Sequence, residues 1–210
     1  MSTKTIRVQG RGAVAQTPDK ISLLLSIEEK HKDFSSAIDG ANLRIETCRL
    51  VAEEVGISPD QIKTSDFGVA DDEEYEHGRR NHIGYLAKHT LRILLPIDKT
   101  LVGKFLSSLA RSKAKPEITL AFIVSDTEAV RKKLLADAVV NAKSHAQTIV
   151  EAAGVSLGSI VNIEHGYSEI RVSSAENNLL FSEAATSDID FDPEDISAED
   201  SVTITWEIGG

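Results

Sequence analysis

The sequence predicts an α+β protein of two lobes, in which helices pack on one face of mostly antiparallel sheets. Several apolar runs alternate with polar residues, as half-buried strands do. Three others recur every three or four residues, as helices do. Hydrophobic residues make up 41% of the 210 residues, which suits one large or two small domains. The expected order is β-β-α-β-β-α-β-α-β-β. We expect lobes at 1–97 and 98–210, with an indistinct boundary because long strands are shared.

Two strands and a helix begin the chain. Residues 6–8 alternate with polar neighbours, and a second alternating run extends over residues 21–27. The next apolar positions follow helical spacing: Phe34, Ala37, Ala41, Ile45, Cys48, Ala52 and Val55. Asp33 is the expected N-cap, and Gly56 is expected to end the helix in a left-handed conformation.

The middle of the chain predicts a hairpin and a short helix. Strands are expected over Ile62–Val69 and Ile83–Leu95, each from its alternating pattern. The charged, aperiodic stretch Ala70–Asn81 between them is typical of a hairpin loop. Asp98 can cap a short helix that ends before Pro116.

The C-terminal part adds a strand, the longest helix and two more strands. A strand is expected over Ile118–Val124, followed by the capping-box spacing of Ser125 and Glu128. The helix that it opens is rich in Ala and ends at Gly154. The last strands are expected from residue 160 to 167 or 172, and from 202 to 208.

Charge is concentrated in one segment. Nine acidic residues and no Lys or Arg lie between Ser173 and Ser201, so this acidic segment carries −9 of the formal net charge of −10. We expect it to be a long loop. The body is nearly neutral and has no basic stripe, which argues against nucleic-acid binding. No apolar run is long enough for a membrane span or a secretory signal, so we expect a cytoplasmic protein.

The glycine string at residues 10–15 does not predict a nucleotide site. A dinucleotide motif needs a helix N-terminus after its glycines, whereas strand residues follow Gly10 and Gly12. We interpret the two glycines as a bulge or bend in a long strand. The lone Cys48 falls on an apolar helix face, which predicts a core residue rather than a nucleophile.

Two places in the sequence carry residues that could bind a metal ion. The six histidines are His31, His77, His82, His89, His145 and His165. Three of them flank the central hairpin beside residues 71–74, which is a sufficient ligand set for zinc. His82 and His89 have opposite strand parity, however, so we expect the three not to converge.

The second place resembles a calcium loop. Asp188, Asp190, Asp192 and Glu199 stand at the first, third, fifth and twelfth positions of an EF-hand loop. Pro193 occupies the sixth position, where the loop needs Gly. We therefore expect a solvated acidic loop without calcium affinity, and predict no catalytic, cofactor or metal residues.

Several blocks in order resemble the SIMPL-domain family. They are Ile6-x-Val8-x-Gly10-x-Gly12 with Pro18-Asp19, Gly56-Ile57 with Ile62-x-Thr64, Tyr85-x-Ala87 with Leu91-x-Ile93, and Ala138-x3-Ala142-Lys143-x2-Ala146 with Gly154-Val155-x-Leu157-Gly158. The resemblance implies an α+β fold, large homo-oligomers and no established catalytic residues. This bacterial family of unknown function includes periplasmic immunogenic and oxidative-stress-defence proteins. We expect the chain to depart from many members in having no signal sequence and in its long acidic segment.

Two functional hypotheses follow. The first is a non-enzymatic, stress-related binding or scaffold module that self-assembles through strand edges and the Ala-rich helix. The acidic segment would then be a solubilising arm or would bind a protein partner. The alternative is an enzyme that uses a small molecule or a metal in a cleft between the lobes, with His89 and His165 as candidate residues.

Overall fold

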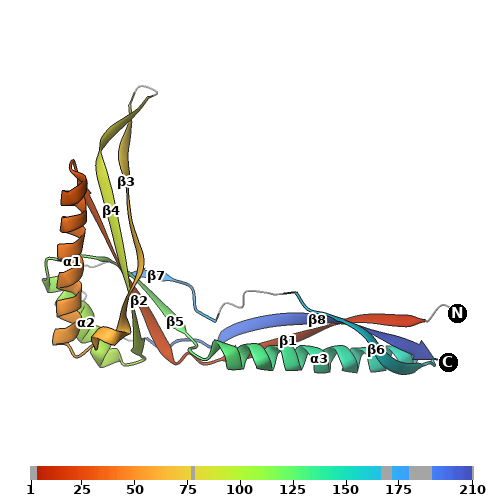
Figure 1. Ribbon diagram of the computed structural model, residues 1–210. Coiled ribbons are helices and arrows are strands. Elements are labelled where there is room, and N and C mark those ends of the chain that lie inside the picture. Colours follow the sequence, from red (N-terminus) through yellow and green to blue (C-terminus); the bar gives the residue numbers. More distant parts are fainter. Residues whose placement is uncertain (1–3, 77–78, 167–171, 180–190, 210) are drawn as a thin grey trace. The chain divides into compact units, whose positions relative to one another are not determined.

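The computed structural model describes residues 4–76, 79–166, 172–179 and 191–209. In these residues, two antiparallel sheets and three α-helices confirm the α+β class (Figure 1). Residues 1–18, 124–173 and 194–210 form one compact unit, called here the terminal unit. Residues 19–123 and 174–193 form the other, the central unit. This division differs from the expected boundary at residue 97, because the first strand pairs with the last.

The terminal unit is a three-stranded sheet with one long helix. Its strand order is β1-β8-β6, with β1 at Thr5–Gln16, β8 at Ile196–Gly209 and β6 at Ser156–Glu164. The helix α3 spans Thr127–Ala152. β1 and β8 stay in register along the whole length of β1. The interpretation of Gly10 and Gly12 as a bulge or bend is therefore wrong.

The two glycines instead let α3 lie directly on β1. A Cβ atom at Gly10 would stand 2.1 Å from the carbonyl oxygen of Ala138, and one at Gly12 would stand 2.0 Å from that of Leu134. Any side chain at either position would push the helix away. Ala138, with Ala142 and Ala146, is fully buried in this contact. The Ala-rich face of α3 is therefore interior, and it is not available for contacts with another copy.

The start of α3 differs by one residue from the prediction. The N-cap is Asp126, whose Oδ1 accepts a hydrogen bond of 2.9 Å from the backbone N–H of Ala129. A carboxylate at this position meets the positive end of the helix dipole as well as an unpaired amide. Gly154 has φ +68° and ends the helix as predicted.

The central unit is a five-stranded sheet with two helices. Its strand order is β3-β4-β2-β5-β7. The strands are β2 Lys20–His31, β3 Ile62–Glu76, β4 Arg79–Pro96, β5 Glu117–Ile123 and β7 Asn177–Leu179; the helices are α1 Phe34–Glu54, α2 Lys99–Arg111 and the short 3-10 turn Pro59–Gln61. α1 packs against β2 and β4, over fully buried side chains such as Leu23, Leu25 and Leu91. Asp98 caps α2 and Gly56 follows α1 with φ +93°, both as predicted.

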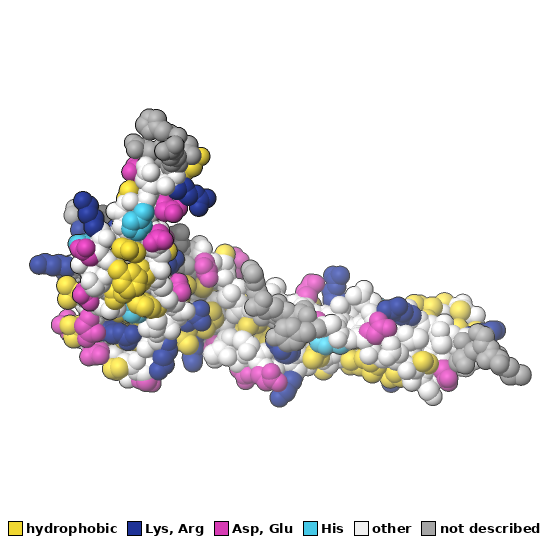
Figure 2. Space-filling model, turned by 45° about the horizontal axis from the view of Figure 1, so that its top comes forward, with side chains coloured by type: hydrophobic (Ala, Val, Ile, Leu, Met, Phe, Trp, Pro, Cys, Tyr) yellow, Lys and Arg dark blue, Asp and Glu magenta, His cyan; other side chains and the backbone are white. Residues whose placement is uncertain are grey.

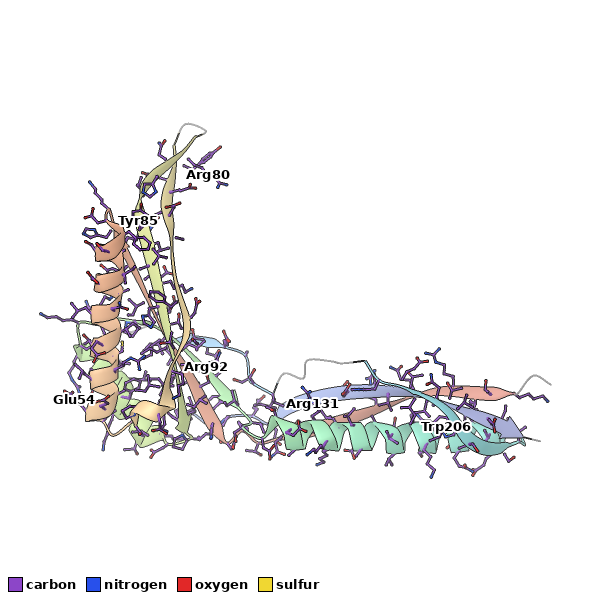
Figure 3. The ribbon with its side chains drawn as sticks, in the orientation of Figure 1. Glu54, Arg80, Tyr85, Arg92, Arg131 and Trp206 are labelled. Carbon is purple, nitrogen blue, oxygen red and sulfur yellow. The ribbon has the colours of Figure 1, made fainter. Side chains whose placement is uncertain are left out.

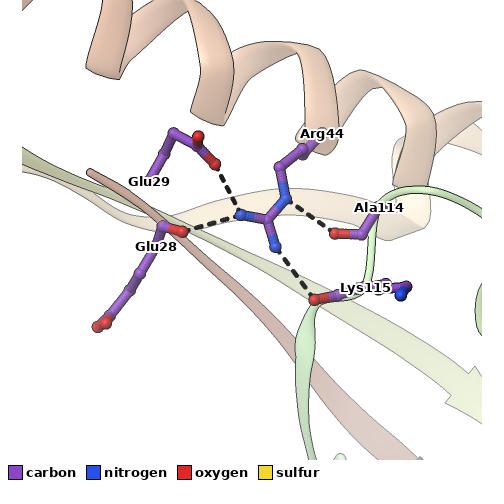
Figure 4. A network of polar contacts seen from close by, with 5 residues as sticks. All are labelled: Glu28, Glu29, Arg44, Ala114 and Lys115. Carbon is purple, nitrogen blue, oxygen red and sulfur yellow. Dashed lines mark hydrogen bonds and ion pairs between the residues drawn. The ribbon is translucent and has the colours of Figure 1, made fainter. Parts of the chain in front are cut away.

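A half-buried arginine joins several elements of this unit. Arg44 of α1 donates hydrogen bonds to the carbonyl oxygens of Glu28 (2.9 Å), Ala114 (2.9 Å) and Lys115 (3.1 Å), and to Oε2 of Glu29 (2.8 Å) (Figure 4). One guanidinium thus joins α1 to the end of β2 and to the loop between α2 and β5. The planar fork of Arg suits such divergent acceptors.

Two stretches expected as loops contain strand. The hairpin loop predicted over residues 70–81 is wrong, because β3 continues to Glu76 and β4 begins at Arg79. Cross-strand charge pairs accompany the extension: Arg80 lies 3.6 Å from Glu73, and His82 lies 3.5 Å from Asp71.

The acidic segment is likewise not a loop throughout. Residues 177–179 form β7, and β8 begins at Ile196, within that segment. In this stretch Ile196 and Ala198 alternate with exposed residues and are buried, so the strand pattern continues through the acidic residues. No helix in the described part of the chain is long and apolar enough to cross a membrane.

Candidate functional site

His89 stands in a small polar cluster between α1 and the edge strand β3. Its Nε2 lies 3.2 Å from Oγ1 of Thr64, and its Nδ1 lies 3.2 Å from Oδ1 of Asn42. Nη2 of Arg49 donates to the same Thr64 oxygen at 3.4 Å. The ring of Phe67 meets the imidazole edge to face at 5.1 Å. Three elements, α1, β3 and β4, thus position this histidine.

The electrostatics of this cluster favour a neutral imidazole. Burial lowers the pKa of His89, and the nearby charge of Arg49 lowers it further. Both ring nitrogens already face a hydrogen-bonding partner, so neither is directed at a site for substrate or metal. The cluster is therefore suited to holding α1 against β3, rather than to acid–base chemistry.

His165 forms a pair with a buried aspartate in the terminal unit. Its Nε2 lies 3.0 Å from Oδ2 of Asp200, whose residue is only 8% exposed. Asp200 lies on the buried face of β8, between Ala198 and Val202, where an apolar side chain is expected. The pair lets a carboxylate occupy that position. His89 and His165 belong to different units, and each has its contacts within its own unit.

The other histidines have local partners. Nδ1 of His31 accepts a hydrogen bond from the backbone N–H of Asp33, and Nε2 of His145 lies 3.4 Å from Nδ2 of Asn141. His77 lies outside the described residues. His82 was expected on the opposite face of its strand from Tyr85 and His89, and it lies elsewhere. The pairing register of β4 is irregular opposite Asp72 and Glu73, and the ring of His82 lies 4.9 Å from that of Tyr85.

Metal-binding side chains do not cluster in the described part of the protein. No group of three or more His, Cys, Asp or Glu residues there could hold a metal ion. Of the calcium-like positions, Asp188 and Asp190 lie outside the described residues. Glu199 lies in β8 opposite Ala13, and its Oε2 is 3.5 Å from Nη1 of Arg11.

Cys48 is a core residue, as its spacing predicts. It is fully buried on the inner face of α1. Burial raises the pKa of its thiol to about 12, which leaves the reactive thiolate unpopulated near neutral pH.

An open pocket that sequence reasoning missed lies where β2 ends beside the hairpin of β3 and β4. It has a volume of about 440 Å³ and is lined by Lys30, His31, Lys32, Asp33, Asp72, Ile83 and Gly84. Nζ of Lys30 lies 2.9 Å from Oδ1 of Asp72 across it. Near it, Tyr85 packs edge to face on Phe34 at 5.4 Å, and Figure 2 shows hydrophobic side chains gathered beside a histidine on this unit. The only sequence signal was the consecutive Lys-His-Lys at the end of an apolar strand.

The two edges of the terminal sheet differ in their protection. α3 covers the edge strand β1, and Oδ1 of Asn141 accepts a hydrogen bond of 2.9 Å from the backbone N–H of Arg11. The opposite edge strand, β6, makes few contacts with α3. Its Ile160, Val161 and Ile163 are each 52–54% exposed. Among the described residues, β6 is therefore an open apolar edge, which is a typical place for chain association.

Comparison with known proteins identifies the family of this chain. The family model described as "SIMPL: Protein of unknown function (DUF541)" matches residues 6–206. The uncharacterized protein YggE of Edwardsiella ictaluri (strain 93-146) is 23% identical over 164 residues, which cover 77% of this chain and 68% of the relative. The match to the family model spans nearly all of the chain, both units included, and the chain therefore belongs to the SIMPL family.

Proposed function

We propose that this protein is a non-enzymatic binding module that self-associates through the edge strand β6. The observation that carries the proposal is the exposure of Ile160, Val161 and Ile163, on an edge that α3 leaves open. The partner in this contact is a second copy of the chain, with β6 against β6 about a twofold axis.

Side chains contribute more than backbone pairing to this contact. The register between β6 and β8 is irregular from Leu157 to Asn162, and such bulges limit the pairing of an added strand. Burying the exposed half of one apolar side chain contributes about 1 kcal/mol, so six of them in a symmetric pair contribute about 6 kcal/mol. The cost of association, about 4–15 kcal/mol, offsets most of this gain, so we expect a weak dimer with a dissociation constant in the millimolar range.

Sedimentation velocity over that concentration range tests the proposal. Replacing Val161 and Ile163 together with Lys should weaken association at least about tenfold, because charges on an edge oppose pairing. Val140 and Ile149, which are 68% and 49% exposed on α3, provide the matched control, since replacing both with Lys adds the same two charges outside the edge. A wild-type protein that stays monomeric, or equal weakening by the control, would contradict the proposal.

The acidic segment stays a proposed solubilising or partner-binding arm. Two of its described residues contact β5 of the central unit: the backbone N–H of Ser174 donates to the carbonyl oxygen of Phe122 at 2.8 Å, and Phe191 packs on the Phe122 ring at 5.4 Å. Replacing Asp192 and Glu194 with Asn and Gln should lower solubility near neutral pH, because net charge opposes association. Unchanged solubility would count against the arm.

A further inference from the structure

The sheet of the central unit is incomplete along one stretch of β4. β2 pairs with β4 only as far as the pair His31 and Tyr85, where β2 ends. β4 continues to Arg79 and pairs there with β3 alone (Figures 1 and 3). Within the described residues, positions 80–83 of β4 therefore form an edge that no strand covers.

The open pocket lies beside β4 at the point where β2 ends. Gly84 lets the end of β2 come close to β4, since a Cβ atom there would stand 2.6 Å from the carbonyl oxygen of His31. The chain then turns away at Lys32 and Asp33 into α1, and the space of about 440 Å³ remains where β2 would have continued. The uncovered edge and the pocket are thus one feature.

The surroundings of this edge favour an extended, acidic segment. A two-stranded ribbon is marginally stable in water, so a third strand would stabilise it. Ile83 is 45% exposed and offers an apolar contact. Asp72 and Asp33 are already close to Lys30 and His31. Among the described residues Lys32 makes no ion pair, and Arg80 has only a contact of 3.6 Å with Glu73 of β3. Both cations are therefore available to a carboxylate beside this edge.

We propose that this edge accepts an extended segment of a partner protein that carries carboxylates, which adds a strand to β4 in the place that β2 leaves. A second copy pairing through the same edge is less suited to these cations. Antiparallel pairing of two β4 strands about Asn81 would bring Arg80 opposite His82, so Arg80 would meet no carboxylate of the other copy. The proposal is independent of self-association through β6.

Fluorescence anisotropy with a labelled octapeptide of alternating Glu and Val tests this proposal. We expect saturable binding, with slower hydrogen exchange at residues 80–83. N-methylation of alternate amides should weaken binding at least about tenfold in one of the two possible patterns, because only one set of amides faces β4. A peptide of alternating Lys and Val should bind at least about fivefold more weakly. No binding at millimolar peptide, or equal binding of all these peptides, would overturn the proposal.

Two variants separate the edge from general electrostatics. Arg80 is exposed, so Arg80→Glu should leave the fold intact while weakening the acidic peptide at least about fivefold. Lys104→Glu makes the same change of charge at an exposed position of α2 in the same unit, and should leave binding unchanged. Equal effects of the two variants would show that the net charge, and not this edge, attracts the peptide.

Discussion

Replacing Gly10 with Ala should destabilise the terminal unit by about 2–3 kcal/mol. The added Cβ would lie 2.1 Å from the carbonyl oxygen of Ala138 and 2.4 Å from the backbone nitrogen of Ala142. Both atoms belong to the helix backbone, so no side-chain rotation can relieve the clash. α3 must move out by more than 1 Å to reach ordinary contact, and the packing over β1 loosens. Overpacking of a core typically costs about 1–3 kcal/mol, and a rigid backbone neighbour favours the upper end.

Trp206 provides the assay, because it is the single Trp of the chain and is buried in the same core cluster. Urea unfolding followed by its fluorescence reports on the terminal unit. Gly166→Ala is the matched control: it lies in the same unit, and a Cβ there would meet nothing within 4 Å. We expect a change within about 0.5 kcal/mol for the control. A similar change for Gly10→Ala would refute the close-approach argument.

The double replacement of Gly10 and Gly12 sharpens this test. A Cβ at Gly12 would stand 2.0 Å from the carbonyl oxygen of Leu134, one turn of α3 from Ala138. A single outward movement of the helix relieves both clashes, so the loss in the double variant should be clearly smaller than the sum of the single losses. Full additivity would show that each residue acts through a separate local effect.

Three further predictions concern the central unit. Arg44→Lys should destabilise it by about 1–3 kcal/mol in urea unfolding followed by circular dichroism, because one ammonium group cannot replace the guanidinium at four acceptors; a loss below about 0.5 kcal/mol would contradict the network. Cys48 should react with a thiol reagent only after the protein unfolds, because the folded thiol is buried. The free energy of unfolding should fall as the pH rises above 9, because the thiol of the unfolded chain loses its proton there while that of the folded chain, with a pKa of about 12, keeps it. In an NMR titration, His89 should have a pKa below the ordinary histidine value, and Arg49→Ala should raise that pKa. The stability that this group contributes should be lost as the pH falls from the ordinary histidine pKa through the lowered pKa of the folded protein. An unshifted titration would argue against burial as the cause.

The sequence predicted the fold well where one physical signal dominated. Alternation located β2 and the longer part of β4, and helical spacing located α1 and α3. Gly56 and Gly154 marked the ends of the two helices, because a left-handed residue after a helix is a local requirement of the backbone. These signals need no knowledge of the rest of the chain.

Prediction failed where distant pairing decided the structure. The stretch from Ala70 to Asn81 has the composition of a loop, yet β3 and β4 stay paired through most of it, with cross-strand charge pairs. The roles of Gly10 and Gly12 depend on a helix more than 120 residues further along the chain. No local pattern contains that information, and spacing alone could not show that a glycine meets a helix backbone.

The candidate sites were harder to predict than the fold, for the same reason. Their components are ends and edges of strands, which only the pairing register defines. The pocket exists because β2 stops at His31 while β4 continues, and parity alone could not show that the irregular register opposite Asp72 brings His82 close to Tyr85. In contrast, the core placement of Cys48 was predictable, since it depended only on helical spacing.

The differences in protection among the strand edges support the two proposed binding surfaces. β1 is covered by a helix that also satisfies the backbone N–H of Arg11, and the hairpin part of β3 carries a run of carboxylates; both are ways in which proteins prevent strands from pairing with other chains. β6 has neither protection, and the end of β4 has a pocket beside it. Uniform protection would be expected if the chain only had to avoid aggregation. In the described residues β1 and the hairpin part of β3 are protected and β7 is only three residues long, whereas β6 and the end of β4 are left open. We therefore infer that these two open edges are the binding surfaces, and that polar side chains such as His89 and Asp200 serve the fold.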